Sequence, residues 1–439
     1  MTDNNPKKRA AIHTLGCRLN QAESGLLAEQ LAGAGYEMVP FGDRADLGVI
    51  HTCTVTREAD AKSRQMVRQF IRANPGARTV VIGCYAQREA EALARLEGVD
   101  LVLGNAEKMH LLRHLAALDA GRGPHVLDAR PARAPFTVPW PQEGPAVTRR
   151  MNLKIQDGCD FMCSFCIIPF ARGRSRPRRF DDLTAEAASL VRRGALELVL
   201  TGVNVGDYAH GKRRLPDVVD ALNALAPLRR IRIGSIELTT IAPGLLERMA
   251  DPAHRLVPYL HVPLQSGSDR ILQAMRRNHT RGEYLELLGR AAATVPDIGL
   301  GADIMTGFPG ETEADFEDSR RLVHESPLSY LHVFKYSERK GSAASRLPDK
   351  TDPAAASARS VVLRALGAEK TRAFQERHLG RRVGVLFEDI EDGWWTGLTG
   401  NYLRVGVRCD GNLRNRIGWV SVEAVGRDFL TGTLDGPAV

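Results

Sequence analysis

The chain contains the segment Gln156-Asp-Gly-Cys159-Asp-Phe-Met-Cys163-Ser-Phe-Cys166, in which three cysteines are spaced C-x3-C-x2-C. Thiolates are soft ligands that favour iron–sulfur clusters, and three of them leave one iron of a [4Fe–4S] cube without a protein ligand. Structural zinc is the alternative, but zinc prefers four protein ligands, usually as two C-x2-C pairs. Only Cys163 and Cys166 form such a pair, and no Cys or His follows them closely. The spacing therefore predicts a cluster with one open iron.

This spacing resembles that of the radical S-adenosylmethionine (SAM) enzymes. The resemblance implies that the open iron chelates the amino and carboxylate groups of SAM, with Cys159, Cys163 and Cys166 as the catalytic cluster ligands. We call these three residues the radical triad. A basic segment follows at residues 169–179. Its Arg172 is expected to contact the SAM carboxylate or an RNA phosphate, because a guanidinium pairs well with both; a solvated charged loop is the alternative.

Composition limits the class of protein. The 439 residues predict two or three domains, and 43% apolar residues are enough to form packed cores. Seven cysteines cannot form a complete disulfide framework, and six of them fall into two groups of three, which indicates metal ligation in a reducing compartment. No signal peptide and no apolar run of ~18 residues is present, so we expect a cytoplasmic protein without a membrane partner. The net charge of +8 suits a polyanionic partner or simply a basic surface.

Residues 1–130 are predicted to form a first domain. Short apolar segments alternate there with helical patterns, which indicates a doubly wound, mostly parallel sheet. The predicted strands are residues 10–15, 47–51, 79–82 and 99–103, and the predicted helices are residues 24–34, 63–73 and 89–96. A segment rich in glycine and proline, about residues 120–148, reads as a linker.

Cys17, Cys53 and Cys84 each follow a predicted strand by one or two residues. We call them the first-domain triad. The carboxyl ends of parallel strands lie along one edge of a sheet, so the three thiols are expected to converge there. A free cysteine is more often a small buried apolar residue, but three at equivalent strand ends favour a second three-thiolate cluster.

The segments around these cysteines resemble the amino-terminal domain of the methylthiotransferases, a radical SAM family. They are residues 14–24 (Thr-Leu-Gly-Cys-Arg-Leu-Asn-Gln-Ala-Glu-Ser), 51–56 (His-Thr-Cys-Thr-Val-Thr) and 83–87 (Gly-Cys-Tyr-Ala-Gln). The resemblance covers nearly the whole chain. It implies two [4Fe–4S] clusters, held by the two triads, together with SAM.

Residues 145–375 are predicted to form the catalytic core. Six strand-like segments alternate with helices, which fits the open (βα)6 partial barrel of radical SAM enzymes. Chemistry in parallel barrels gathers at the carboxyl ends of the strands. Loops that merely join elements are the alternative, but the loops at these ends carry the residues expected to contact SAM: Thr201, Gly202, Asn204, Glu237, Gln265 and Asp303.

Residues 378–439 change to short alternating strands separated by Gly and Asp turns, which predicts a small β-barrel. This part resembles the TRAM domain, an OB-like RNA-binding module. Exposed aromatic and arginine side chains suit RNA stacking and phosphate contact, although tryptophans in so small a barrel are often core. The candidates are Trp394, Trp395, Tyr402 and Arg404. Cys409 has no partner cysteine nearby and is expected to be incidental.

The resemblance implies a transferase that places a methylthio group on C2 of a modified adenine at position 37, beside the anticodon of tRNA. The sequence around Cys17 and Cys53 is closest to that of the branch that acts on N6-threonylcarbamoyladenosine. Arg18 stands in place of an expected Lys, and His51 in place of an expected Asn. Branches that act on isopentenyladenosine or on a ribosomal-protein aspartate are alternatives, as is a non-catalytic iron–sulfur RNA-binding protein. Expected partners are the tRNA anticodon stem-loop and an electron donor such as flavodoxin or ferredoxin. The sequence does not specify the oligomeric state.

Overall fold

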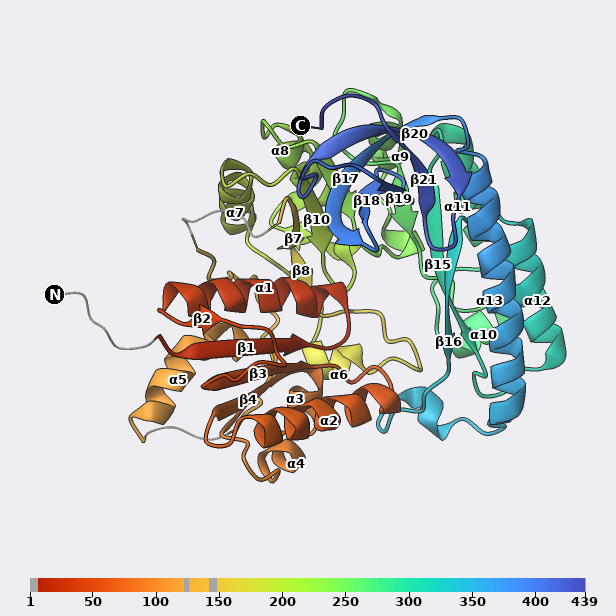
Figure 1. The fold of residues 1–439 in the computed structure, drawn as a ribbon. Helices are drawn as coiled ribbons and strands as arrows, with labels where there is room; N and C mark the ends of the chain where they lie inside the picture. The colour runs from red at the N-terminus through yellow and green to blue at the C-terminus, as the bar shows by residue number, and fades with distance from the viewer. Residues whose placement is uncertain (1–6, 122–125, 142–147, 439) are drawn as a thin grey trace.

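The computed structural model describes residues 7–121, 126–141 and 148–438. Its main sheets occur in three groups along the chain: a six-stranded sheet, two three-stranded sheets and a closed five-stranded barrel. Figure 1 shows the first sheet in red and orange, the core strands from yellow through green to cyan, and the terminal barrel in blue. This is the predicted fold class, an α/β chain with a parallel first sheet, a core of six parallel strands and a small terminal β-barrel.

The first sheet is parallel, with strand order β2-β1-β3-β4-β5-β6. Helices α1 and α5 pack on one face, and α2 and α4 on the other. Strands β3 and β4, in the middle of this sheet, are almost wholly buried because helices cover both faces, as is usual for parallel sheets. The strands are β1 (Arg9–Thr14), β2 (Glu37–Met38), β3 (Leu47–Thr52), β4 (Arg78–Gly83), β5 (Leu101–Leu103) and β6 (Val126–Leu127). The helices are α1 (Arg18–Gly33), α2 (Arg57–Ala73), α3 (Cys84–Arg88), α4 (Ala90–Ala94) and α5 (Leu111–Asp119).

Several boundaries differ from the predicted ones. The first helix begins at Arg18, directly after Cys17, rather than at residue 24. Two short helices replace the single one predicted at residues 89–96, because the non-helical backbone of Glu89 (φ −133°, ψ 40°) interrupts them. Strands β2 and β6 are only two residues long, too short for an alternating pattern, and β6 lies in the segment predicted as a linker.

The central strands run in the order β7-β10-β13 and β14-β15-β16, all parallel. Isolated parallel bridges, Ile231 to Leu256 and Ser235 to His261, join the two halves into one open array. The strands are β7 (Arg150–Lys154), β10 (Glu197–Thr201), β13 (Arg230–Ile233), β14 (Tyr259–His261), β15 (Gly299–Thr306) and β16 (Tyr330–Lys335). The main outer helices are α7 (Phe180–Arg192), α8 (Leu215–Asn223), α9 (Leu245–Ala250), α10 (Asp269–Ala274), α11 (Arg281–Thr294), α12 (Glu313–Glu325) and α13 (Pro353–Glu376). Short hairpins β8/β9 (Gln156–Asp157, Arg176–Pro177) and β11/β12 (Ala209–His210, Arg213–Arg214) were not predicted.

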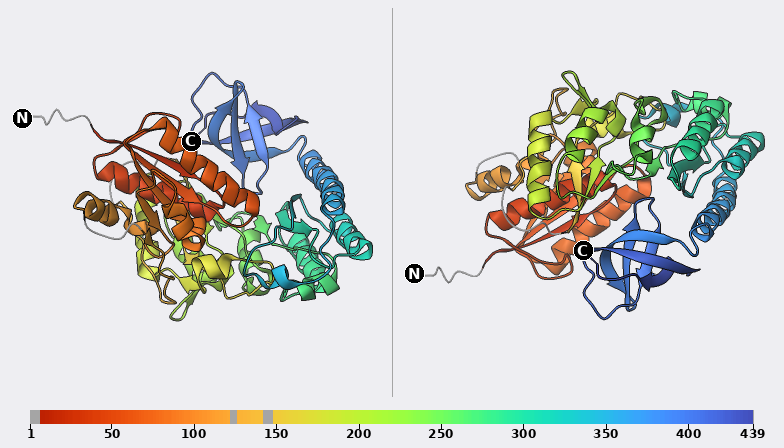
Figure 2. Two further views of the ribbon diagram at one scale, coloured as in Figure 1. Left: turned by 90° about the horizontal axis from the view of Figure 1, so that it is seen from below. Right: turned by 90° about the horizontal axis from the view of Figure 1, so that it is seen from above.

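The terminal barrel closes in the order β17-β18-β19-β21-β20. Two buried arginines attach it to the core: Arg232 donates to the carbonyls of Gly400 and Thr399, and Arg230 to those of Gly384 and Leu398. Figure 2 shows this barrel beside the first domain, with the core against both. Its strands are β17 (Arg382–Glu391), β18 (Trp394–Thr399), β19 (Arg404–Val407), β20 (Ile417–Val425) and β21 (Leu430–Leu434).

The aromatic residues of this barrel differ in environment. Tyr402 has a positive φ of 73° and turns toward the core, where its ring lies 4.9 Å from that of Tyr259. Tyr402 is therefore half-buried rather than exposed, as are Trp394 and Trp395. Trp419, which was not singled out, is half exposed, with Arg382 lying 5.0 Å from its ring centroid. Within the described ranges, no helix has the length and apolarity needed to cross a membrane.

Candidate active site between two cysteine triads

The radical triad lies on the loop between β8 and α6 (Ile168–Arg172). Gly158 starts this loop with a φ of +71°, and a Cβ there would lie 2.1 Å from the carbonyl oxygen of Arg174. The Cys166 amide donates to the Cys163 carbonyl at 3.0 Å, which closes a tight turn between the two thiols. Burial raises the pKa of both Cys159 and Cys166 to about 12, with the neighbouring thiols acting in the same direction. Cluster assembly must therefore remove protons from this site.

Arg277 is a functional candidate that sequence reasoning missed. Its guanidinium donates to Cys163 Sγ at 3.5 Å and to Glu237 Oε1 at 3.0 Å. Glu237, predicted to contact SAM, is thereby placed beside the radical triad. Burial opposes the charge of Arg277, but Glu237 and Cys163 together raise its pKa above the usual value. Arg277 is thus a fixed cation at the cluster loop.

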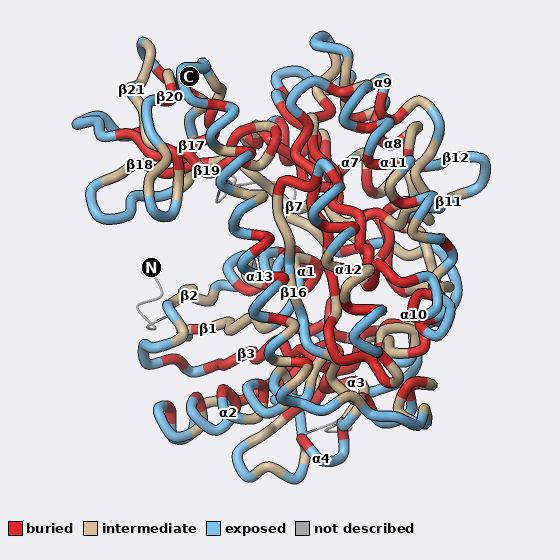
Figure 3. The backbone as a smooth tube through the Cα atoms, turned by 90° about the vertical axis from the view of Figure 1, so that its right-hand side faces the viewer, coloured by how far each residue is buried: buried red, intermediate tan, exposed pale blue. Residues whose placement is uncertain are grey.

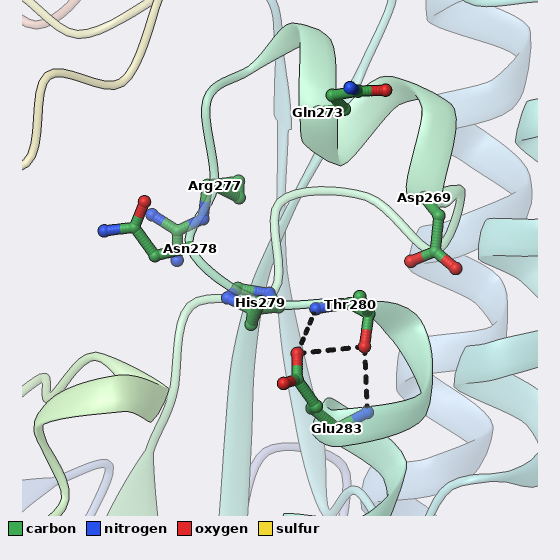
Figure 4. Close-up of a pocket in the computed structure, with 7 residues that line it drawn as sticks. All are labelled: Asp269, Gln273, Arg277, Asn278, His279, Thr280 and Glu283. Carbon is green, nitrogen blue, oxygen red and sulfur yellow. Dashed lines mark hydrogen bonds between the residues drawn. The ribbon is translucent and has the colours of Figure 1, made fainter.

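Arg277 also lines a hollow of about 430 Å³ between α10 and α11, which Figure 4 shows. The far wall is the start of α11, where Thr280 and Glu283 form a reciprocal capping box. This cap fixes the end of the segment that carries Arg277.

Gln156 connects the cysteine loop to the loop after β10. Its side-chain oxygen accepts from the amides of Val203 and Asn204 at 2.9 and 3.1 Å, and its nitrogen donates to the Gly158 carbonyl at 2.7 Å. Asn204 continues the connection, because its side-chain oxygen accepts from Thr240 Oγ1 at 3.1 Å. Thr201, the last residue of β10, and the predicted SAM residues Gly202 and Asn204 that follow it therefore lie beside the start of the cysteine loop.

The first-domain triad lies at the carboxyl edge of the first sheet. Cys53 and Cys84 directly follow β3 and β4, and Cys17 follows β1. Gly16 has a φ of +95°, and its missing side chain leaves room for Cys53, whose Sγ would lie 2.8 Å from a Cβ at Gly16. Burial raises the pKa of Cys53 to about 11, and the nearby Cys84 and Cys17 thiols act in the same direction. The three thiols are thus close enough to influence one another.

A buried ion network connects the two triads. Glu23 of α1 accepts from Lys108, Lys154 and Arg172 at 2.5, 2.6 and 3.0 Å. Lys154 and Arg172 also donate to Asp157, two residues before Cys159, at 2.7 and 2.9 Å. All five side chains are at most 4% exposed. The network therefore locks α1 of the first domain onto the core.

Arg172 has partners other than the predicted ones. It is 1% exposed, and besides its two carboxylates it donates to Asn20 at 2.6 Å. In this position it meets neither solvent nor an RNA phosphate. Its pKa is raised, against the effect of burial, first by Glu23 and then by Cys84, Asp157 and Cys17.

The charges in this network suit thiolate ligands. Four cations, Lys108, Lys154, Arg172 and Arg176, contact only two carboxylates, Glu23 and Asp157, so positive charge is in excess. Asn105, hydrogen-bonded to Lys108 at 2.7 Å, donates to Cys84 Sγ at 3.7 Å. Buried positive charge beside thiols stabilises their ionised, metal-binding form.

The spacing of the thiols bears on which metal they could hold. Among the described residues, the one group of His, Cys, Asp and Glu whose ligand atoms all lie within 4.8 Å of one another is His261, Asp303 and His332. Neither triad is therefore drawn together as tightly as a single tetrahedral zinc ion requires, with its Zn–S bonds of about 2.3 Å. Three thiolates that leave one iron open are the ligand set of a four-iron cube, and both triads offer that set.

A cavity of about 820 Å³ lies beside the first-domain triad, and the radical triad contributes no residue to its lining. The first domain lines it through Cys17 and Cys53, and the core lines it through the loop residues Thr201 and Gly202. The remaining lining residues are Gly16, Arg18, Leu19, Gln21, Val55, Arg150, Asn152, Gly234, Ser235, Tyr259, His261, Asp303, His332 and Phe334. Residues from two domains thus share one binding space.

Asp303 lies in the wall of this cavity and is held by two histidines. Its Oδ1 is 3.2 Å from His261 Nε2 and 3.1 Å from His332 Nδ1. These contacts hold the pKa of Asp303 well below its usual range although burial opposes them. Gln265, the last predicted SAM residue, has a φ of 75° and exchanges backbone hydrogen bonds with β15, at Asp303 and Met305. Its side chain does not line the cavity described above.

Comparison with known families agrees with this architecture. Residues 9–104 match the uncharacterized protein family UPF0004, and residues 153–323 match the radical SAM superfamily. The radical SAM match implies a [4Fe–4S] cluster and SAM as cofactors.

Similar curated proteins span almost the same length. The threonylcarbamoyladenosine tRNA methylthiotransferase MtaB of Bacillus subtilis is 33% identical over 96% of this chain and 95% of its own. The protein of the same name from Aquifex aeolicus is 36% identical over 90% and 96%. A tRNA-2-methylthio-N6-dimethylallyladenosine synthase from Cereibacter sphaeroides is 38% identical over 87% of each chain.

Solved structures support the fold alone. The radical SAM methyltransferase TsrM from Kitasatospora setae superposes with a TM-score of 0.53 at 14% identity, covering 75% of each chain. The cobalamin-dependent radical SAM enzyme OxsB gives 0.52 at 11% identity, covering 84% of this chain and 56% of its own. On the relatives' identity and coverage together with the two cysteine triads, this chain is a transferase that belongs to the radical SAM tRNA methylthiotransferase family.

Proposed function

We propose that this protein converts N6-threonylcarbamoyladenosine at position 37 of tRNA, beside the anticodon, to its 2-methylthio derivative. The observation that carries the proposal is the single cavity lined by Cys17 and Cys53 on one side and by Thr201, Gly202 and Asp303 on the other. A base held there lies beside a candidate sulfur site and against core residues proposed to contact SAM. An RNA-binding protein without catalysis has no need of such a shared space.

Each triad has a proposed role. The radical triad holds one [4Fe–4S] cluster and the first-domain triad a second, so the chain carries two. Together with SAM, the clusters supply an electron, a carbon radical strong enough to remove hydrogen from an aromatic C–H, and sulfur. The residues proposed to contact SAM are Thr201, Gly202, Asn204, Glu237, Gln265 and Asp303.

The protein's own residues position these groups. Gln156 holds the loop after β10, which is proposed to contact SAM, against the cysteine loop by accepting hydrogen bonds from two backbone amides. The buried network around Glu23 fixes the first domain, and therefore the candidate sulfur site, relative to the core. Positioning of this kind contributes strongly to rate because reacting atoms must lie within about 3–3.5 Å.

The choice of modified adenosine rests on the sequence around Cys17 and Cys53 and on the names of relatives. Two of the relatives described above are named for threonylcarbamoyladenosine, and a third for dimethylallyladenosine at similar identity.

We further propose a division into residues 1–130, 145–375 and 378–439, with the terminal barrel contacting the anticodon stem-loop. The proposed location is the cytoplasm, with flavodoxin or ferredoxin as electron donor.

The test uses reconstituted, reduced full-length protein with SAM and three anticodon stem-loops. These carry threonylcarbamoyladenosine, isopentenyladenosine or unmodified adenosine at position 37. Mass spectrometry of the nucleosides is expected to find the methylthio product from the first RNA only. A variant with alanine throughout the radical triad is the control for non-enzymatic sulfur transfer. Product from the isopentenyl RNA alone would refute the proposed substrate and leave the family assignment intact.

A further inference from the structure

Arg18 is a cation in the wall of the central cavity without a carboxylate partner. The other charged residues of the wall are neutralised: Arg150 pairs with Glu197 and Glu388, and Asp303 contacts two histidines. The guanidinium of Arg18 instead lies 5.2 Å from the centroid of the Tyr402 ring and donates to its hydroxyl. Among the described residues, no carboxylate lies within ion-pair distance of it.

Arg18 lines the cavity proposed to receive the substrate base, so its charge faces that space. Arg18 is the first residue of α1 and directly follows Cys17 of the first-domain triad. It is partly buried, and the cavity it lines also reaches Thr201 and Asp303 of the core. Tyr259, 4.9 Å from Tyr402, adds an aromatic surface to the same wall.

A partly desolvated guanidinium without a counter-charge favours an anionic ligand. Pairing with a carboxylate restores the interactions that arginine loses when a ligand displaces water, and charge-assisted hydrogen bonds of this kind are strong. An uncharged apolar substituent would displace the same water without accepting a hydrogen bond from the guanidinium. The cavity wall therefore favours a substituent with a carboxylate and disfavours an apolar one.

Building on the proposed function, we propose that Arg18 is the residue that selects the substrate by pairing with the carboxylate of its threonylcarbamoyl group. The carboxylate of SAM is expected at the radical triad, whereas Arg18 lies beside the opposite triad. A backbone phosphate is a less suitable partner, because the cavity that Arg18 lines is the one that must admit the base.

The test measures equilibrium binding of anticodon stem-loops to the full-length protein. One RNA carries threonylcarbamoyladenosine at position 37, and the other carries its carboxamide analogue, which has nearly the same shape without the charge. Wild-type protein is expected to bind the acid at least about tenfold more tightly, which corresponds to ~1.4 kcal/mol. Arg18→Met is expected to bind the two RNAs equally, and Arg18→Lys to retain part of the preference.

Arg408→Met is the matched control, because Arg408 is an exposed arginine that lies 4.7 Å from the Trp394 ring centroid and does not line the cavity. It is expected to keep the wild-type ratio. Because each variant is compared with itself on two RNAs, a general loss of folded protein does not change the ratio of the two affinities. The ratio measured for the wild-type protein tests the proposal without any variant.

Three outcomes would overturn the proposal: a wild-type ratio near one, a normal ratio in Arg18→Met, or equal weakening of both RNAs by Arg18→Met with the ratio preserved. The last result would assign Arg18 to a phosphate. The proposed function fails separately if the wild-type protein cleaves SAM but forms no methylthio product from the threonylcarbamoyl RNA.

Discussion

Replacing Gly16 by alanine is expected to prevent cluster binding at the first-domain triad and to spare the radical triad. A Cβ on Gly16 would lie 2.7 Å from Cβ and 2.8 Å from Sγ of Cys53, and real Cβ contacts essentially never fall below 3.0 Å. The Cys53 thiol must therefore move away from the other two. Alanine at a φ of +95° adds backbone strain of about 1–2 kcal/mol, and the overpacking adds about 1–3 kcal/mol.

Gly35→Ala is the matched control. Gly35 is also exposed and has a φ of +92°, but a Cβ there would meet no atom within 4 Å. The control therefore carries the backbone strain without the clash. The difference between the two variants isolates the displacement of Cys53 from the general effect of a strained alanine.

The assay measures iron per chain after reconstitution, 5′-deoxyadenosine and methylthio nucleoside. Gly16→Ala is expected to bind about four fewer irons than Gly35→Ala, to form 5′-deoxyadenosine normally and to yield no methylthio product. Circular dichroism checks that both variants fold. A folded Gly16→Ala protein with full iron and normal product would show that Cys53 is not a cluster ligand.

Three further predictions concern the core. Alanine throughout the radical triad should abolish 5′-deoxyadenosine formation while leaving the iron of the first-domain triad; continued SAM cleavage would refute the assignment. Arg277→Met should make the reduction potential of the radical-triad cluster more negative, because it removes a positive hydrogen-bond donor from Cys163 Sγ. Redox titration followed by electron paramagnetic resonance measures this potential, and an unchanged value contradicts the prediction. Burial alone would raise the pKa of Glu197, but Arg232, Arg230 and Arg150 lower it to about 2, below the usual value of about 4.3. This depressed pKa stabilises the fold above pH ~4.5, and roughly 3 kcal/mol should be lost between pH ~4.5 and 2; acid unfolding should be flatter in Glu197→Gln than in wild type.

The parts of the site that are local in sequence could be predicted. The radical triad is recognisable because its three cysteines lie on one short loop. The first-domain triad is spread over the chain, but all three residues follow strands of one parallel sheet, and that topology brings them together. The open parallel core and the closed terminal barrel follow from alternation of strands with helices and from short alternating strands, respectively.

The parts that arise from contact between elements could not be predicted. Arg277 follows the fourth core strand by sixteen residues, and nothing in its own surroundings indicates that it reaches Cys163. Arg172 lies in a basic run typical of a solvated loop, yet the packing of α1 against the core buries it. Tyr402 occupies a turn, where alternation does not specify direction, and its positive φ turns the ring inward.

The network around Glu23 has a consequence for how such proteins can be recombined. A chimera that took its first domain from another protein would bring its own counterparts of Glu23 and Lys108 to Lys154, Asp157 and Arg172 of this core. Each mismatch would leave a buried charge unpaired, at a cost of about 3–5 kcal/mol, against a total stability of about 5–15 kcal/mol for a typical protein. The first domain is therefore not an interchangeable module, and substitutions on the two sides of this boundary must be inherited together.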